Sequence, residues 1–527
     1  MRALPLLSLC LSLSACAGAP PIDSDSSVPP DAVAPMLDSA VSSPDVALES
    51  ARDSAPDAPA ANPPLARYLA VSEVAIFQGV RVALFSSDAL VAARNAPVVT
   101  GRAAAVRVYV TPAAGFTARS VTAELLWEES PGTVTALRET RMIVGASREG
   151  DPNSVFTFQV DAARVRSSSR WSVRLLDPAG AAPAGASPAR APRDGALAAL
   201  SPSNAPGAVR VTLVPVRWTR DGSNRLPDTS TEQLQRLRSL LVALYPITAV
   251  EFTVHAPIDF GTTTFTGNVN FGSLNGVLEA LRDREMPADD VYYYGLVAPD
   301  VSRAAYCGRS CVTGQSYVVS NIADATIRVG SGVGFTGDDT AWTFAHELGH
   351  LFGREHAPCS TSGADTRYPY RGATLGVWGW DARDNTFFDP TMTTDFMGYC
   401  DPQWVSDYTY RALYVRASTL RPGPMALTSA DGAPLVHVAT LFDDGALRYS
   451  HTRRPKSLPR GSATLEARYF DGRDALLGSA LASLVPIADG EPGSSANVFV
   501  PDTFDRATRV ELRAPEGARY TLALPAR

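Results

Sequence analysis

Lysine is almost missing from this chain: Lys456 is the only one among 47 basic residues, and arginine supplies the rest. Against 54 acidic residues the formal charge is −7, so the chain lacks the basic excess of a nucleic-acid-binding protein, and no nucleic-acid partner is expected. It also lacks any run of about 20 apolar residues, which argues against a membrane-spanning helix in the mature protein. Hydrophobic residues still make up 45% of the chain, enough for a buried core.

The first residues follow the pattern of a bacterial export signal. Arg2 precedes an apolar run over residues 3–13 and then small residues, and the run is too short for a membrane span. The tetrad Leu-Ser-Ala-Cys that ends at Cys16 resembles a lipobox. We therefore predict a signal peptide over residues 1–15 and a lipid on Cys16 that anchors the exported protein to a bacterial membrane, at the outer membrane or cell surface. The alternative is a plain signal peptide with an incidental cysteine.

Residues 16–64 are predicted to be a disordered tether. They are largely Ala, Pro, Ser and Asp without an aromatic residue, so they cannot bury enough apolar surface to offset the entropy of ordering. Eight acidic residues against Arg52 give this segment a charge of −7, which equals that of the whole chain. Because like charges repel, we expect this segment to be an extended linker between the membrane and the folded domains.

The polarity pattern divides the rest of the chain into three domains and a linker. Over residues 65–180, β-branched and aromatic segments alternate with Gly, Pro and Ser turns, which predicts a β-sandwich of roughly immunoglobulin type. Residues 181–207 are rich in Ala, Pro, Ser and Gly and are predicted to be a linker. Strand-like and helix-like segments alternate over residues 208–424, which indicates an α+β domain. Strand patterns return over residues 425–527 and predict a smaller β-domain.

Two segments within residues 208–424 show most clearly the hydrophobic pattern of a strand or a helix. Val209–Trp218 is β-branched and apolar, as a buried strand would be. Thr229–Tyr245 carries leucines at helical spacing: Leu234, Leu237, Leu240, Leu241 and Leu244. A strand followed by a helix is therefore expected at the start of this domain.

Three of the six histidines fall within eleven residues: His346, His350 and His356. The first two are four residues apart, so on a helix they face the same side and can bind one metal ion. Gly353 lies where this helix should end. A glycine there can take the left-handed conformation, which turns the chain and can return His356 as a third ligand.

This spacing predicts a catalytic zinc site with one ion. Three neutral imidazoles leave one tetrahedral position open for water, which distinguishes a catalytic site from a structural one. Glu347 follows the first ligand and is placed to accept a proton from water whose pKa the metal has lowered to about 7. Asp339 or Thr340 is the expected N-cap of the helix. The alternative, a helix with ordinary surface histidines, requires a chance match on the order of 10⁻⁶.

The pattern His-Glu-x-x-His-x-x-Gly-x-x-His over residues 346–356 resembles the metzincin zinc peptidases in every fixed position. That family also has a methionine turn beneath the zinc, and Met397 is the matching residue. The resemblance implies that Tyr399 stabilises the tetrahedral intermediate, as in the astacin-like and serralysin-like members. It also implies a metzincin-type α+β domain, a twisted mixed sheet with an active-site helix. The N-terminal and C-terminal β-sandwich domains predicted on either side rest on the strand patterns and not on the resemblance.

The resemblance carries three further expectations. Residues 397–410 are similar to exported bacterial metzincins, including those that cleave mucin-type glycoproteins. The family binds substrate as an extended strand against a sheet edge, and Ser316–Gly330 is the candidate for that edge. The propeptide cysteine switch of matrix metalloproteases has no counterpart here, so latency of that kind is not expected.

Four cysteines remain once Cys10 and Cys16 are set aside: Cys307, Cys311, Cys359 and Cys400. An even number in an exported protein suggests two disulfides, for which three pairings can be written. The resemblance favours the pairs 307–311 and 359–400, because it brings the third histidine and the methionine turn together beneath the zinc. A thiolate ligand is the lesser alternative, since it would fill the open position on the metal.

The leading hypothesis is a zinc-dependent endopeptidase that cleaves extracellular proteins or glycoproteins, with Glu347 as the general base. The second is a surface adhesin or glycan-binding lipoprotein in which the β-domains bind and the zinc domain is inactive. The third is hydrolysis of a non-peptide amide or ester at the same site. Nothing in the sequence identifies the substrate or the cleavage preference.

Overall fold

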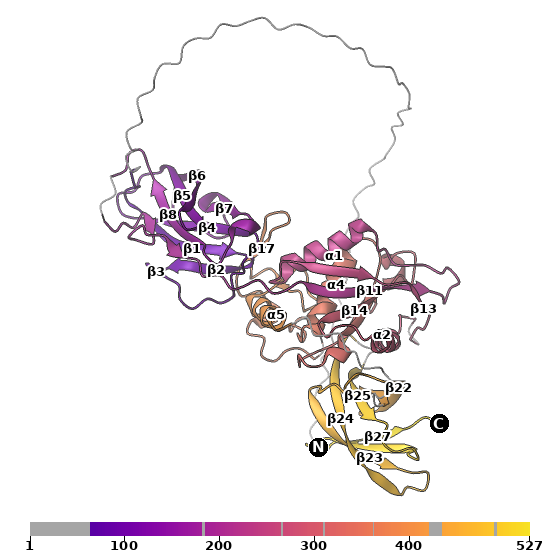
Figure 1. Ribbon diagram of the computed structural model, residues 1–527. Helices are drawn as coiled ribbons and strands as arrows, with labels where there is room; N and C mark the ends of the chain where they lie inside the picture. Colours follow the sequence, from indigo (N-terminus) through magenta and orange to yellow (C-terminus); the bar gives the residue numbers. More distant parts are fainter. Residues whose placement is uncertain are drawn as a thin grey trace, which may run out of the picture. The chain divides into compact units, whose positions relative to one another are not determined.

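The computed structural model describes residues 64–181, 185–264, 267–308, 311–361, 363–420, 435–489 and 493–526. The predicted signal peptide, Cys16 and nearly all of the predicted tether lie outside these ranges. Residues 61–527 form one compact unit. Its described part is a mixed α+β fold with much more sheet than helix (Figure 1). No helix in that part is long and apolar enough to cross a membrane.

Two antiparallel sheets make up the N-terminal part of this unit. Their strands are β1 (Leu69–Phe77), β2 (Gly79–Ser86), β3 (Ala89–Leu90), β4 (Ala104–Pro112), β5 (Arg119–Ser130), β6 (Thr133–Ile143), β7 (Phe156–Val160), β8 (Arg170–Leu176), β9 (Arg190–Ala191), β10 (Ala198–Ala199), β17 (Gly379–Asp381) and β18 (Thr386–Phe388). One sheet has the order β18-β17-β2-β1-β4-β7, with β3 paired to β2, and the other the order β10-β8-β5-β6, with β9 paired to β8. Buried side chains from both sheets, such as Val106 and Leu125, share one core.

Short strands from two unexpected places complete these sheets. β9 and β10 lie within residues 181–207, where the composition predicts a linker, and both pair with β8. β17 comes from residues 208–424, for which a separate α+β domain is predicted, and it pairs with β2. Trp404 of β20 (Gln403–Trp404) also donates its indole N–H to the carbonyl of Gly79 at 2.8 Å. The N-terminal and central parts are therefore joined by shared strands and not only by a connecting segment.

A mostly parallel sheet forms the centre of the unit. Its strands are β11 (Val209–Trp218), β12 (Val250–Val254), β13 (Ile258–Phe260), β14 (Val291–Val297), β15 (Gly314–Tyr317) and β16 (Val329–Val333). The order is β12-β11-β14-β16-β15, with β13 also paired to β11, and β15 alone runs antiparallel to its neighbour β16. β14 is buried along almost its whole length, as expected of a parallel strand covered on both faces.

The helices cover both faces of this sheet. They are α1 (Thr231–Leu244), α2 (Phe271–Glu285), α3 (Arg303–Cys307), α4 (Asp338–Leu351) and α5 (Asp407–Thr419), with single 3₁₀ turns at Pro152–Ser154, Ala162–Arg164, Ala325–Ile327 and Arg371–Ala373. α1 and α4 share a core with Tyr292 and Tyr294 of β14, whereas α2 packs with Tyr293. Because side chains alternate along a strand, α2 lies on the face opposite to α4.

The C-terminal strands are all antiparallel. They are β21 (Val436–Phe442), β22 (Leu447–Arg453), β23 (Ala463–Phe470), β24 (Leu476–Ala488), β25 (Ser494–Pro501), β26 (Arg509–Arg513) and β27 (Arg519–Ala523). They enclose their own core around residues such as Leu465 and Val498. The end of β24 pairs with β15, so the central sheet continues into the C-terminal one.

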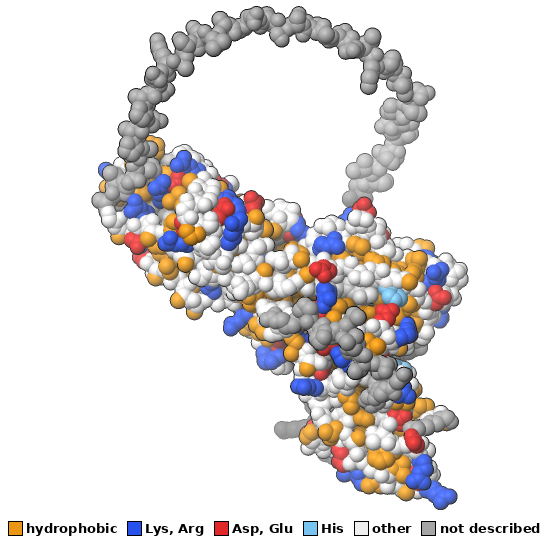
Figure 2. Space-filling model, in the orientation of Figure 1, with side chains coloured by type: hydrophobic (Ala, Val, Ile, Leu, Met, Phe, Trp, Pro, Cys, Tyr) orange, Lys and Arg blue, Asp and Glu red, His pale blue; other side chains and the backbone are white. Residues whose placement is uncertain are grey.

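Charged side chains are scattered on the face drawn in Figure 2, where basic and acidic groups alternate with uncharged ones. Hydrophobic side chains are spread among them on the same face.

Candidate metal centre

Helix α4 carries the first part of the histidine pattern. It begins at Asp338, after Gly337, whose φ is 119°. The predicted N-cap was therefore wrong: Asp339 and Thr340 lie inside the helix, and the hydroxyl of Thr340 donates to the carbonyl of Phe335 at 2.6 Å. Asp338 and Asp339 instead occupy the first turn, where carboxylates interact favourably with the helix dipole.

The first two histidines point their Nε2 atoms at the same place. These atoms are 3.0 Å apart. The Nδ1 atom of His346 lies 2.8 Å from the carbonyl oxygen of Phe396, and that of His350 lies 2.7 Å from the carbonyl oxygen of Arg354. Because a carbonyl only accepts, each Nδ1 carries the hydrogen and each Nε2 keeps a lone pair for a metal ion. Burial lowers the pKa of His350 to about 4, so this imidazole is neutral at pH 7.

The chain turns after α4, as Gly353 predicts. Its φ is 80°, and a Cβ at this position would lie 2.8 Å from the carbonyl oxygen of Val319, so only glycine fits. Beyond the turn, the amide of Ala357 donates to the carbonyl of Met397 at 2.9 Å, which fixes the returning segment. His356 thereby joins the other two histidines in one cluster of ligand atoms, all within 4.8 Å of one another.

Glu347 is buried beside this cluster, with 2% of its surface exposed. Its Oε2 has no hydrogen-bond partner among the described residues. A Cβ at Gly314 of β15 would lie 2.5 Å from its Oε1, so the carboxyl group rests directly against the backbone of that strand. Burial, and then the negative charge of Asp489, raise the pKa of Glu347 well above its usual range. A buried oxygen without a hydrogen-bond partner is costly, so its retention here indicates a functional position.

Met397 lies beneath the histidines in a tight turn between two short parallel strands, β19 (Thr394–Asp395) and β20 (Gln403–Trp404). The carboxylate of Asp395 accepts from the amides of Met397 at 2.9 Å and Ser406 at 3.0 Å, which fixes the turn. A Cβ at Gly349 would lie 2.4 Å from the sulfur of Met397. The thioether therefore packs against α4 at a glycine between the two helical histidines.

Tyr399 lies at the rim of the cluster and is 47% exposed. Its hydroxyl is 3.2 Å from Nε2 of His356, and its ring stacks beside that of His346. From this position the phenol can donate a hydrogen bond to a group bound at the histidines.

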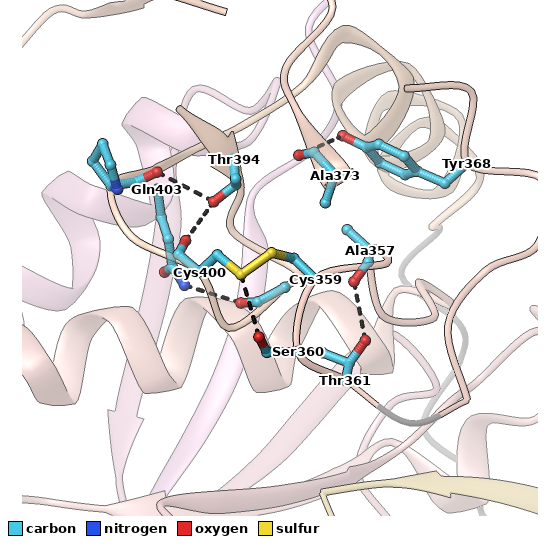
Figure 3. The surroundings of a disulfide bond; sticks show 11 residues. Ala357, Cys359, Ser360, Thr361, Tyr368, Ala373, Thr394, Cys400 and Gln403 are labelled. Carbon is cyan, nitrogen blue, oxygen red and sulfur yellow. Dashed lines mark hydrogen bonds between the residues drawn. A yellow bond between two sulfur atoms is a disulfide. The ribbon is translucent and has the colours of Figure 1, made fainter. Parts of the chain in front are cut away.

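Both disulfides that the resemblance implies are present, Cys307–Cys311 and Cys359–Cys400. The second joins the segment after the third histidine to the segment after the methionine turn (Figure 3). The amide of Tyr399 also donates to the carbonyl of Cys359 at 3.0 Å. The bridge thus holds the two loops that bear the third histidine and the tyrosine in one position.

The structure adds Asp489, which sequence analysis missed. Its Oδ2 lies 3.2 Å from Nε2 of His346 and 3.3 Å from Nε2 of both His350 and His356. Burial alone would raise the pKa of Asp489, but the three imidazoles outweigh it and hold that pKa well below the usual range. Asp489 is 133 residues from His356 in sequence and belongs to no recognisable motif, so no local signal could have revealed it.

A cleft of about 1300 Å³ opens onto these groups. It is lined by the three histidines, Glu347 and Tyr399, and also by Ile487 and Ala488 of β24 and by Asp489, which follows that strand.

Residues 328–423 match the family model of Peptidase M66. The match supports a metallopeptidase. The matched span includes β16, α4, the three histidines, Met397 and α5, whereas β15 and Asp489 lie outside it. No curated protein matches the chain.

The ligand atoms of the three histidines and Asp489 are of the kinds that bind a metal ion. Imidazole nitrogens and a carboxylate oxygen are common ligands of zinc, which binds them at about 2.0–2.2 Å in a tetrahedral arrangement. Ligand atoms in such a tetrahedron are about 3.3 Å apart. The distances from Oδ2 of Asp489 to the three Nε2 atoms, 3.2–3.3 Å, fit that spacing closely.

Proposed function

We propose that this protein is a zinc-dependent endopeptidase of the metzincin type. The observation that carries the proposal is the convergence of three imidazole Nε2 atoms with the buried carboxyl group of Glu347 in one cleft, where its Oε2 has no hydrogen-bond partner among the described residues. The Peptidase M66 match over the same elements supports peptide-bond hydrolysis as the reaction.

In this proposal His346, His350 and His356 hold the ion. A zinc ion bound there supplies a Lewis acid that polarises the scissile carbonyl group and lowers the pKa of water. Glu347 accepts the proton of the attacking water and then delivers it to the nitrogen of the departing amine. Its position favours this role, because the carboxyl group is buried beside the ligand atoms and its Oε2 has no hydrogen-bond partner among the described residues.

Tyr399 contributes from the rim of the cleft. Its exposed hydroxyl donates a hydrogen bond to the oxygen that becomes negatively charged as water adds to the carbonyl carbon. The methionine turn and the Cys359–Cys400 bridge position this tyrosine relative to the third histidine.

Glu347→Gln tests the mechanism, because it preserves the shape of the side chain and removes its basicity. We expect this variant to bind zinc stoichiometrically and to cleave a panel of proteins and glycoproteins about 10²- to 10⁴-fold more slowly than the parent. Glu516→Gln, an exposed glutamate in the turn between β26 and β27, is the control and should cleave like the parent. Cleavage by Glu347→Gln at the parental rate would show that the mechanism is wrong.

We also propose that the peptidase acts outside the cytoplasm on proteins or glycoproteins, anchored to a bacterial membrane by lipid on Cys16. The support is the charged, apolar and small-residue order of residues 1–15, followed by the cysteine and an acidic tether. Cys16→Ala should move the protein from the membrane fraction to the soluble exported fraction. An unchanged membrane fraction in that variant would contradict the anchor.

A further inference from the structure

The strand beside the candidate catalytic groups already has a partner on each side. β15 pairs with β16 on one side and with the end of β24 on the other, where Ser316 faces Ala488 and Tyr317 faces Ile487. The amide of Val318 also donates to the carbonyl of Pro486 at 3.0 Å. The sheet edge within Ser316–Gly330 that was expected to receive a substrate strand is therefore covered by residues 486–488 of the C-terminal domain.

Asp489 follows this strand directly and enters the histidine cluster. Its backbone has a φ of 59°, a conformation that few residues other than glycine adopt but that aspartate tolerates. Its Oδ2 is almost equidistant from the three Nε2 atoms, at 3.2–3.3 Å. Its Oδ1 lies 3.1 Å from Nε2 of His356, so the carboxylate fills the space in front of all three imidazoles, where a catalytic zinc site leaves a position open for water or substrate.

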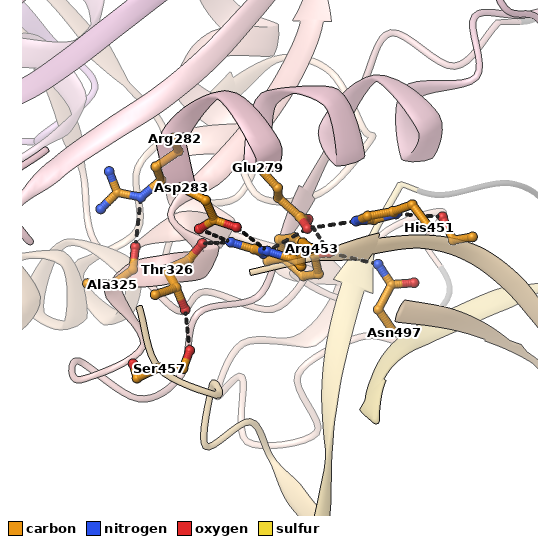
Figure 4. A network of polar contacts seen from close by, with 11 residues as sticks. Glu279, Arg282, Asp283, Ala325, Thr326, His451, Arg453, Ser457 and Asn497 are labelled. Atoms are coloured by element: carbon orange, nitrogen blue, oxygen red, sulfur yellow. Dashed lines mark hydrogen bonds and ion pairs between the residues drawn. The ribbon is translucent and has the colours of Figure 1, made fainter. Parts of the chain in front are cut away.

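A buried polar network holds the C-terminal domain in this position (Figure 4). The guanidinium of Arg453 on β22 has no exposed surface and pairs at 2.7 Å with both Glu279 and Asp283 of α2. Glu279 also accepts from Tyr317 of β15, whose hydroxyl in turn accepts from Asn497 of β25 at 2.8 Å. The network joins both domains and includes a residue of the covered edge, so the covering strand belongs to a well-satisfied interface.

We propose that the C-terminal β-domain is an intramolecular inhibitor of the zinc site. Its residues 486–488 take the place of a substrate strand on β15, and Asp489 takes the fourth ligand position on the metal. A polypeptide substrate binds only after this segment is displaced. This inference rests on the proposed function, and the experiment below separates a failure of the one from a failure of the other.

The test uses a small hydroxamate, which needs the open ligand position but no peptidase activity. Acetohydroxamate is titrated into the full mature chain loaded with Co²⁺, and its binding is followed by the cobalt absorption bands. We expect Asp489→Ala to bind it at least about tenfold more tightly than the parent, because the docked segment lowers the apparent affinity by the fraction of open molecules. Peptide hydrolysis should rise by a similar factor.

Asp474→Ala is a matched control. Asp474 lies in the same domain, before the other end of β24, and has the same φ of 59°. Its side chain is 81% exposed and pairs with Arg509, away from the histidines. Hydroxamate affinity in this control should equal that of the parent.

A second variant opens the cleft without touching the cluster. Arg453→Met removes the centre of the buried network, and hydroxamate affinity should again increase, whereas Arg519→Met, an exposed arginine of β27, should not change it. Circular dichroism of each variant verifies that the domains remain folded.

The outcomes are distinct. Equal hydroxamate affinity in Asp489→Ala and the parent would overturn the inference. So would an Asp489→Ala protein that no longer retains the metal, because Asp489 would then be a permanent ligand of a closed site. Tighter hydroxamate binding without any peptide hydrolysis would support the inhibitory segment and contradict the proposed peptidase.

Discussion

The ion pair between Glu279 of α2 and Arg453 of β22 allows a quantitative prediction. Both side chains are fully buried, and their closest atoms are 2.7 Å apart. We expect Glu279→Gln to weaken the attachment of the C-terminal strands to α2. The guanidinium would lose one of its two carboxylate partners and would still be buried.

The size of the effect follows from the pKa of Glu279. Burial alone would raise this pKa, but Arg453, His451 and Tyr317 outweigh burial and lower it from 4.5 to about 2. A shift of this size corresponds to about 3 kcal/mol of stabilisation. Because the pKa is lower in the folded than in the unfolded state, the stabilisation is complete above about pH 4.5 and is lost as the pH falls toward 2. Removal of one member of a buried ion pair typically lowers the free energy of unfolding by about 3–5 kcal/mol, in agreement with the value obtained from the pKa of Glu279.

Hydrogen exchange at the amide of Val318 measures the effect, because this amide donates to Pro486 across the domain junction. At pH 7 its exchange should be about 10²-fold faster in Glu279→Gln than in the parent, and the difference should shrink near pH 3. Glu511→Gln, which disrupts a surface pair with Arg513, is the control and should change the opening free energy by less than about 1 kcal/mol. Equal exchange in the two variants would refute the reasoning.

Three further predictions concern the histidine cluster. Gly349→Ala should lower the free energy of unfolding by about 1–3 kcal/mol, measured by urea denaturation, because the new Cβ would lie 2.4 Å from the sulfur of Met397. A variant more stable than the parent would contradict this packing. Replacement of Cys359 and Cys400 by serine opens a loop of 41 residues and should lower the free energy of unfolding, measured in guanidinium, by about 4 kcal/mol. A decrease of less than about 1 kcal/mol would contradict this value. Tyr399→Phe should lower kcat about 10²-fold at constant zinc content, and an unchanged kcat would remove the tyrosine from the mechanism.

The sequence predicts best those elements whose pattern is local. The strand over Val209–Trp218 appears with the expected bounds, since a continuous β-branched run has few alternatives. One short motif, His-Glu-x-x-His-x-x-Gly-x-x-His, predicts helix α4, the turn at Gly353 and the cluster of three histidines. All three features depend only on the spacing of nearby residues. The signal peptide and the lipid on Cys16 stay predictions.

Features that depend on distant pairing could not be predicted. β24 contains Gly478 and Pro486, residues that weaken a strand pattern, and it was not expected as a strand. β9 and β17 are too short to show any period, so their pairing with the N-terminal sheets was also missed. The position of Asp489 depends on the register of β24 against β15, which only the folded chain defines.

The central claim is that three histidines and Glu347 form a zinc peptidase site. It is tested most directly by mass-spectrometric detection of new N-termini after a peptide library and glycoprotein panel are incubated with Asp489→Ala, and with the double variant Asp489→Ala/Glu347→Gln. We expect cleavage at internal peptide bonds by the single variant alone, with one zinc ion bound to each protein. Cleavage that survives in the double variant, or no cleavage by either variant with zinc bound, would contradict it.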